Sequence, residues 1–254
     1  MPSAADIVFV FILVVVVSIL EYVYFWPHLR ADVAAGRPGA RTRAYRRAVI
    51  GQWLFTLGAI AIWKAYARPW SALRLPPPRG WQLALGGGVV LVTAALTLVQ
   101  LKSIPRLSAT QRASARSKLA DLAFMLPHTR QEEFWFLILS VTAGFCEELL
   151  YRGYLPWVFA PWLGAPGAMA AVVAIFGLSH AYQGRKGAVK ATIAGASMAI
   201  IVMTTGSLIP AMIVHALIDI CGGTVGYWLL RDAVSAEKGP PARSTAAFTL
   251  AADG

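Results

Sequence analysis

Long apolar runs dominate this sequence and limit what it can fold into. An α-helix of about 20 apolar residues crosses the roughly 30 Å hydrocarbon core of a bilayer. Of the 254 residues, 57% are hydrophobic and only 14% are charged, whereas an average domain has about 25% charged residues. The sequence therefore predicts an all-α, polytopic membrane helix bundle with about seven transmembrane helices. The expected spans are residues 7–25, 48–67, 81–101, 134–153, 165–182, 188–205 and 208–230.

The basic residues lie mainly in the loops between these spans. The formal net charge is +11, but no nucleic-acid-binding motif accompanies it, so we expect the lipid bilayer as a partner and no nucleic acid. By the positive-inside rule, the loops after the first, third and fifth spans and the C-terminal tail face the cytoplasm. Arg outnumbers Lys, and Ala, Gly and Val are abundant, which is typical of a GC-rich bacterial gene. We therefore expect a multi-pass protein of the cell membrane, in a bacterium the inner membrane.

The segment between the third and fourth spans, residues 108–127, allows two interpretations. Arg112, Arg116 and Lys118 precede a cluster of Leu, Phe and Met residues, as in an amphipathic helix that lies on lipid headgroups. A plain basic linker would have the same composition. At the other end of the chain, residues 233–254 are expected to form a disordered tail.

The last four spans contain ionisable side chains, which are unfavourable in hydrocarbon. A charged residue at the centre of a spanning helix costs about 2.5–3.5 kcal/mol on insertion scales, so such residues face a partner or a water-filled cavity. Three helices each provide such groups, and their convergence would create a polar site. The residues concerned are Glu147, Glu148, Arg152, His180, His215 and Asp219.

Helical spacing sorts these side chains into pairs, because residues four apart lie on one face of a helix. Glu148 can pair with Arg152, and His215 shares a face with Asp219. Glu147 points in a different direction from Glu148 and has no cation on its own helix. The spacing therefore leaves Glu147 as the carboxylate that is free to act.

Two kinds of chemistry fit one carboxylate and two imidazoles. Glu, His and His are ligand types of zinc hydrolases, in which the metal lowers the pKa of bound water towards 7. Glu147, His180 and His215 would then be the ligands of zinc or another divalent metal. A Glu and a His alone can also remove a proton from water. The residue types leave both alternatives open.

Three short motifs carry a resemblance to a known family. EELLYR at residues 147–152, FGLSH at 176–180 and HALID at 215–219 resemble the EExxxR, FxxxH and HxxxN/D motifs of the CPBP family. This family contains the type II CAAX prenyl endopeptidases and bacteriocin-processing relatives. The resemblance implies an intramembrane endopeptidase, either a metalloprotease or a glutamate protease, whose partner is a membrane-associated peptide or protein substrate.

The resemblance also implies a role for each residue of the first two motifs. Glu147 and His180 would activate water to attack a peptide carbonyl, and Glu148 and Arg152 would orient the site. The implied catalytic core covers residues 132–232, after N-terminal membrane helices and an interfacial linker at 1–131.

The third motif departs from the form that many family members have. The resemblance assigns His215 and Asp219 to oxyanion stabilisation or metal binding, but many members have Asn at the last position, where an amide N–H can donate to an oxyanion. An ionised Asp219 would repel that charge. Three interpretations remain: Asp219 is protonated, orients His215, or binds a metal.

Two other classes of protein are compatible with buried polar residues in a membrane bundle. A non-catalytic immunity or scaffold protein could keep the same fold and bind a peptide partner. A proton-coupled transporter also uses intramembrane carboxylates and histidines. A transporter would show internal repeats or discontinuous helices in both halves, whereas the polar residues here are confined to one half.

Overall fold

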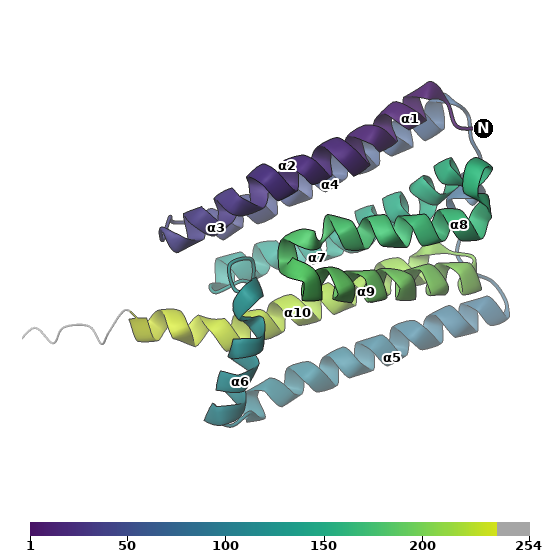
Figure 1. Ribbon diagram of the computed structural model, residues 1–254. Helices are drawn as coiled ribbons and strands as arrows, with labels where there is room; N and C mark the ends of the chain where they lie inside the picture. The colour runs from purple at the N-terminus through teal and green to yellow at the C-terminus, as the bar shows by residue number, and fades with distance from the viewer. Residues whose placement is uncertain (238–254) are drawn as a thin grey trace, which may run out of the picture.

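The described part of the protein is helical. The computed structural model describes residues 1–237 and, within them, the side chains up to residue 231; these residues contain helices and no strand (Figure 1). The elements are α1 (Ala4–Phe11), η1 (Ile12–Val17), α2 (Ser18–Leu20), η2 (Glu21–Phe25), α3 (Trp26–Ala34), α4 (Ala40–Ala65), η3 (Trp70–Leu73), α5 (Trp81–Ser103), η4 (Ile104–Arg106), α6 (Ala109–Leu119), η5 (Ala120–Leu122), α7 (Arg130–Glu148), η6 (Leu149–Tyr154), α8 (Leu155–Ser179), η7 (Ala181–Gln183), α9 (Gly184–Thr205) and α10 (Leu208–Glu237).

The described residues contain six helices that are long and apolar enough to cross a membrane. The fourth of them is a stretch of 50 residues, Arg130–Ser179, which includes two of the seven predicted spans. This stretch turns back at Gly164, whose φ of 66° and ψ of 165° are not helical, and Pro161 and Pro166 flank the turn. Figure 1 shows α7 and the second part of α8 running in opposite directions. The predicted all-α polytopic bundle is therefore confirmed.

The first helix is longer than its predicted span. Elements α1 to α3 form one continuous helix, Ala4–Ala34, which begins at a Ser3 capping box and contains two π-helical segments, η1 and η2. This helix and α4 form a hairpin at one side of the bundle (Figure 1). The hairpin packs on η6 and α8 around a buried core that includes Trp63, Tyr154, Leu155, Val158 and Val172.

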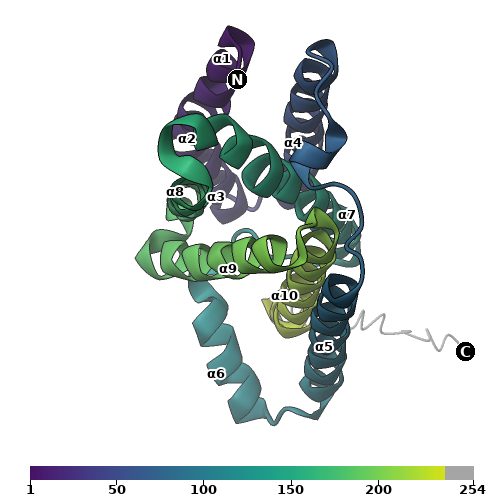
Figure 2. The same ribbon diagram turned by 90° about the vertical axis from the view of Figure 1, so that its right-hand side faces the viewer.

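Helix α10 occupies the centre of the bundle, with α7, α9 and α5 around it (Figure 2). Its close approach to α7 depends on Gly144, where an added Cβ would lie 2.7 Å from the carbonyl oxygen of Met212 and 2.8 Å from the Cβ of Ala216. Helix α10 continues to Glu237, so residues 233–237 of the predicted disordered tail are helical. The rest of that predicted tail lies outside the described residues.

The segment between α5 and α7 is helical over residues 109–119. Helix α6 begins with a capping box in which Ser108 and Gln111 satisfy each other's backbone N–H groups. It runs across the direction of the spanning helices, at the end of the bundle where α3 ends and α7 begins (Figures 1 and 2). This arrangement matches the helical rather than the linker interpretation of the segment.

Candidate active site

The two adjacent carboxylates of the first motif lie at a change of helical geometry. Glu147 and Glu148 are the last residues of α7, and the π-helical segment η6 follows them directly. Such π-helical insertions are rare and frequently occur at functional sites. Because Gly144 lies one turn earlier, α7 approaches α10 closely at this level. The sequence thereby places both carboxylates against the face of α10 that carries His215.

Glu148 is buried, and one of its carboxylate oxygens accepts hydrogen bonds from both Arg152 and His215. Its Oε1 atom accepts hydrogen bonds from Nη1 of Arg152 at 3.1 Å and from Nδ1 of His215 at 2.7 Å. A carboxylate at this site only accepts, so the ring proton of neutral His215 lies on Nδ1 and leaves a lone pair on Nε2. Glu148 thus fixes both the tautomer and the orientation of His215.

Arg152 ties this pair to a third helix. Its Nη2 donates to the carbonyl oxygen of Gly195 on α9 at 3.0 Å, and its guanidinium lies 4.4 Å from the centre of the Phe176 ring on α8. An added Cβ on Gly195 would lie 3.0 Å from Nη2, so glycine leaves room for the guanidinium. Arg152 neutralises Glu148, as the four-residue spacing predicts. It also links η6 to α8 and α9.

The other side of the His215 ring faces two further carboxylates. Its Nε2 lies 3.9 Å from Oε2 of Glu147 and 3.6 Å from Oδ2 of Asp219. Side-chain exposure rises outward from 0% at Glu148 through 12% at His215 and 19% at Glu147 to 38% at Asp219. The cluster therefore has a closed end at Glu148 and an accessible end at Asp219.

His180 lies next to this cluster and not inside it. It follows the last residue of α8, where its Nδ1 donates to the carbonyl oxygen of Phe176 at 2.8 Å. The Phe176 ring is near both imidazoles, with centroid distances of 4.6 Å to His180 and 6.4 Å to His215. Among the described residues no hydrogen bond joins His180 to Glu147 or His215, although His180 and Asp219 interact through their charges.

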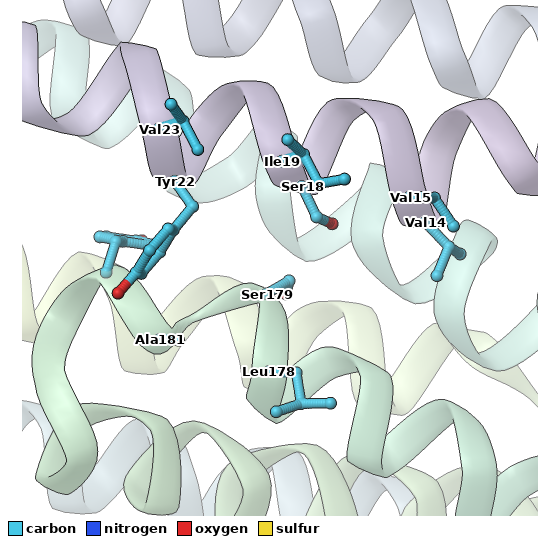
Figure 3. Close-up of a pocket in the computed structure, with 10 residues that line it drawn as sticks. Val14, Val15, Ser18, Ile19, Tyr22, Val23, Leu178, Ser179 and Ala181 are labelled. Atoms are coloured by element: carbon cyan, nitrogen blue, oxygen red, sulfur yellow. The ribbon is translucent and has the colours of Figure 1, made fainter.

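A groove of about 380 Å³ opens beside His180, between the first helix and the end of α8. Figure 3 shows Ser18 and Tyr22 of the first helix across the groove from Leu178 and Ser179. The Ser179 hydroxyl lies 3.2 Å from Nδ1 of His180. The remaining lining is mainly aliphatic: Val14, Val15, Ile19, Val23, Ala181 and Tyr182.

The predicted metal ligands do not form one ligand set. Zinc ligands converge on a common centre about 2.0–2.2 Å from each donor atom. Within residues 1–237, no group of three or more His, Cys, Asp and Glu side chains is placed to hold a metal ion. Glu147 and His215 are neighbours, but no described ion pair or hydrogen bond joins His180 to either of them. The arrangement of Glu147, His180 and His215 therefore does not fit a shared metal ion.

Two polar residues near Glu147 were missed by the sequence reasoning. Gln52 on α4 donates from Nε2 to Oε1 of Glu147 at 2.7 Å. Glu21 lies in the middle of the long first helix, where its charge interacts with that of Glu147. The signal that could have found them is that each is a polar residue within a predicted span, Gln52 in 48–67 and Glu21 in 7–25.

Comparison with known proteins gives one result for part of the chain. Residues 129–221 match the family model described as type II CAAX prenyl endopeptidase Rce1-like. No curated protein and no solved structure matches the chain. The matched region contains the three motifs and every residue of the Glu147–Asp219 cluster. Through residues 129–221, the chain is thus similar to the type II CAAX prenyl endopeptidase Rce1-like family.

Proposed function

We propose that this protein hydrolyses a peptide bond of a membrane-associated protein or peptide, with Glu147 as the general base. The observation that carries the proposal is the difference between two adjacent carboxylates. Glu148 is buried and bound to Arg152 and His215, whereas Glu147 directs Oε2 towards Nε2 of His215 and is partly exposed. A base must reach both water and the proton that it removes, and only Glu147 of the two meets this requirement.

The reaction follows from the positions of these groups. Glu147 removes a proton from water while the water oxygen bonds to the carbonyl carbon of the substrate. The tetrahedral intermediate then collapses, the C–N bond breaks, and Glu147 returns the proton to the leaving nitrogen. In the protonated state His215 has a second N–H at Nε2, because Nδ1–H is already donated to Glu148. That second N–H can stabilise the oxyanion.

Asp219 and His180 have supporting roles in this proposal. Asp219 lies 3.6 Å from Nε2 of His215, which favours orientation of the imidazolium over direct contact with an oxyanion. His180 keeps an Nε2 lone pair, since Nδ1 donates to Phe176. This lone pair can accept a hydrogen bond from the same water.

The proposed substrate enters from the membrane. The groove beside His180 is lined mainly by aliphatic side chains and two hydroxyl-bearing residues of the first helix, Ser18 and Tyr22 (Figure 3). An apolar lining fits the lipid-soluble part of a membrane-associated substrate. We place the enzyme in a bacterial inner membrane, where a membrane protein or peptide is the expected substrate rather than a prenylated protein.

The test uses the purified protein in vesicles with two sets of internally quenched peptides, one with a transmembrane segment and one with a farnesylated CAAX sequence. Glu147→Gln should lower kcat/KM by about 10²- to 10⁴-fold, the usual contribution of a general base. Glu133→Gln at the start of the same helix is the matched control and should retain activity. Cleavage by the Glu147→Gln variant at the wild-type rate would refute the proposal.

Two further measurements on the same preparation separate the alternatives. Chelation with EDTA followed by restoration with zinc asks whether a divalent metal takes part. Binding of an uncleaved peptide by both wild type and Glu147→Gln, without hydrolysis by either, would instead assign the chain to the non-catalytic immunity or scaffold class.

A further inference from the structure

Helix α4 meets the end of α7 at three consecutive residues. Trp53 stacks on Phe145 with ring centroids 5.4 Å apart, Thr56 lies next to Cys146, and Gln52 bonds to Glu147. Helix α4 precedes the family-matched region, which begins at residue 129. A residue on this helix is therefore in direct contact with the proposed base although the matched motifs do not include it.

We infer that Gln52 is a positioning residue for Glu147, an inference that rests on the proposed function. The amide Nε2–H donates to Oε1 of Glu147 at 2.7 Å, while Oε2 of the same carboxylate faces Nε2 of His215 at 3.9 Å. The two carboxylate oxygens of Glu147 thus have different partners. Oε1 is anchored to α4, and Oε2 is directed into the space that the reacting water would occupy.

Hydrogen-bond chemistry fixes the orientation of the Gln52 amide. An ionised carboxylate only accepts, so Nε2 must face Glu147, and the opposite orientation would place two acceptors together. Charge-assisted hydrogen bonds of this kind are shorter and stronger than neutral ones. The contact therefore holds Oε1 of Glu147 on α4 and leaves Oε2 for the reacting water.

The second polar atom of Gln52 supports the same placement. Its Oε1 is buried and has no hydrogen-bond partner among the described residues. A buried acceptor is nearly always satisfied by a donor or an ordered water, and a buried water requires two to four polar partners. Oε1 of Gln52 lies on the same amide that donates to Glu147, so the partner that it requires would lie beside this contact.

The packing of α4 against α7 explains how the Gln52 amide can be held in a fixed position relative to Glu147. A catalytic side chain must be held to within about 0.5 Å by rigid elements and supporting hydrogen bonds. The stacked Trp53 and Phe145 rings, with an interplanar angle of 23°, join α4 and α7 one residue from Gln52 and two residues from Glu147. Gln52 is thereby presented to Glu147 from a helix, not from a loop.

The test compares Gln52→Met, which keeps the length of the side chain and removes the donor, with Gln100→Met on an exposed part of α5. In the vesicle assay, Gln52→Met should lower kcat by about 10- to 100-fold, the effect of losing a hydrogen bond to a charged group. KM should change less than about twofold, because Gln52 contacts the base and not the substrate. Gln100→Met should behave as wild type, and Gln52→Asn, which keeps the amide but shortens its reach, should fall between the two.

A second measurement does not depend on cleavage. Infrared spectra of wild type minus Glu147→Gln isolate the carboxylate stretch of Glu147, and this band should shift in Gln52→Met and not in Gln100→Met. An unshifted band, or a Gln52→Met variant with wild-type kcat in a preparation where Glu147→Gln is inactive, would overturn the inference and leave the proposed function standing. If the band shifts in Gln52→Met but the wild-type protein cleaves none of the peptides, the proposed function would be overturned, and with it any catalytic role for Gln52.

Discussion

Two buried clusters in this protein use the same residue types and differ in how completely they are hydrogen-bonded. One is the active-site cluster around Glu147, Glu148 and His215. The other, which we call the latch, joins Asp6 of the first helix to Arg68 after α4 and Tyr154 of η6. Each contains a carboxylate and a guanidinium in or beside an apolar bundle, where such groups are unfavourable unless paired.

The latch is saturated. Arg68 donates to both oxygens of Asp6 at 2.7 and 2.6 Å, the Tyr154 hydroxyl donates to Oδ1 at 2.6 Å, and Ser3 donates to Oδ2 at 2.6 Å from its backbone N–H and from its hydroxyl. Asp6 is fully buried, and these bonds to Asp6 raise the pKa of Arg68 above its usual value. No oxygen of Asp6 is left for chemistry, so the latch is a structural device.

The active-site cluster is unsaturated by comparison. Oε2 of Glu148 and Oε1 of Gln52 are buried without a partner among the described residues. Glu147 and Asp219 lie 3.9 and 3.6 Å from His215 Nε2, beyond good hydrogen-bond distance. A buried charge in a membrane protein is thus a functional candidate when its hydrogen-bonding capacity is incomplete, and a structural one when it is complete.

Among the changes that distinguish the two clusters, Asp6→Asn is expected to have the largest effect on stability. This change keeps the shape of the side chain and leaves Arg68 without its counter-charge, which should lower the free energy of unfolding by about 3–5 kcal/mol. Unfolding in detergent, followed by circular dichroism, measures the loss. Because the latch has no part in the reaction, kcat of the molecules that remain folded should match wild type.

The control for this prediction is Asp32→Asn, which removes a solvent-exposed ion pair with Arg37. Exposed pairs contribute about 0–1 kcal/mol, so Asp32→Asn should change stability little. Equal stability losses in the two variants would show that burial and saturation do not distinguish the latch from a surface pair.

A smaller loss of stability and a larger loss of activity are expected from Gly144→Ala. The new Cβ would meet the Met212 carbonyl oxygen at 2.7 Å and must push α10 away from α7. Overpacking of this kind costs about 1–3 kcal/mol. It should also lengthen the hydrogen bond that His215 donates to Glu148. Thermal unfolding and kcat in the vesicle assay measure the two effects.

Gly222→Ala is the matched control on α10, because an added Cβ there lies within 4 Å of no described neighbour that would resist it. It should leave both stability and kcat near wild type. A Gly144→Ala variant with wild-type kcat would show that the active site tolerates separation of the two helices.

The sequence predicted the bundle and the main pairs because their physical causes are local. Apolar length determines spans, and four-residue spacing brings Glu148 to Arg152 and His215 to Asp219. The turn at Gly164 was not predicted, although two prolines flank it, and the seven predicted spans did not show that α7 and α8 form one helical stretch.

What the sequence could not predict depends on contacts between distant segments. Asp6 and Arg68 are 62 residues apart, and Gln52 and Glu147 are 95 residues apart. No periodicity relates such positions, because the register between two helices is set by side-chain packing along their whole contact. The contact of Phe176 with both imidazoles has the same origin, since His180 and His215 lie on different helices.

The smallest effect is expected from Tyr154→Phe, which tests whether the latch and the active site are separate. The hydroxyl is one of several donors to Asp6, so its removal should lower the free energy of unfolding by about 1 kcal/mol. Tyr24→Phe on the exposed side of the first helix is the control and should have no effect. Tyr154 belongs to η6, which begins directly after Glu148, so a change in the latch has a short covalent path to the base. If kcat in Tyr154→Phe fell tenfold while unfolding was unchanged, η6 would be transmitting strain to Glu147, and saturation alone would no longer separate structural from functional charges.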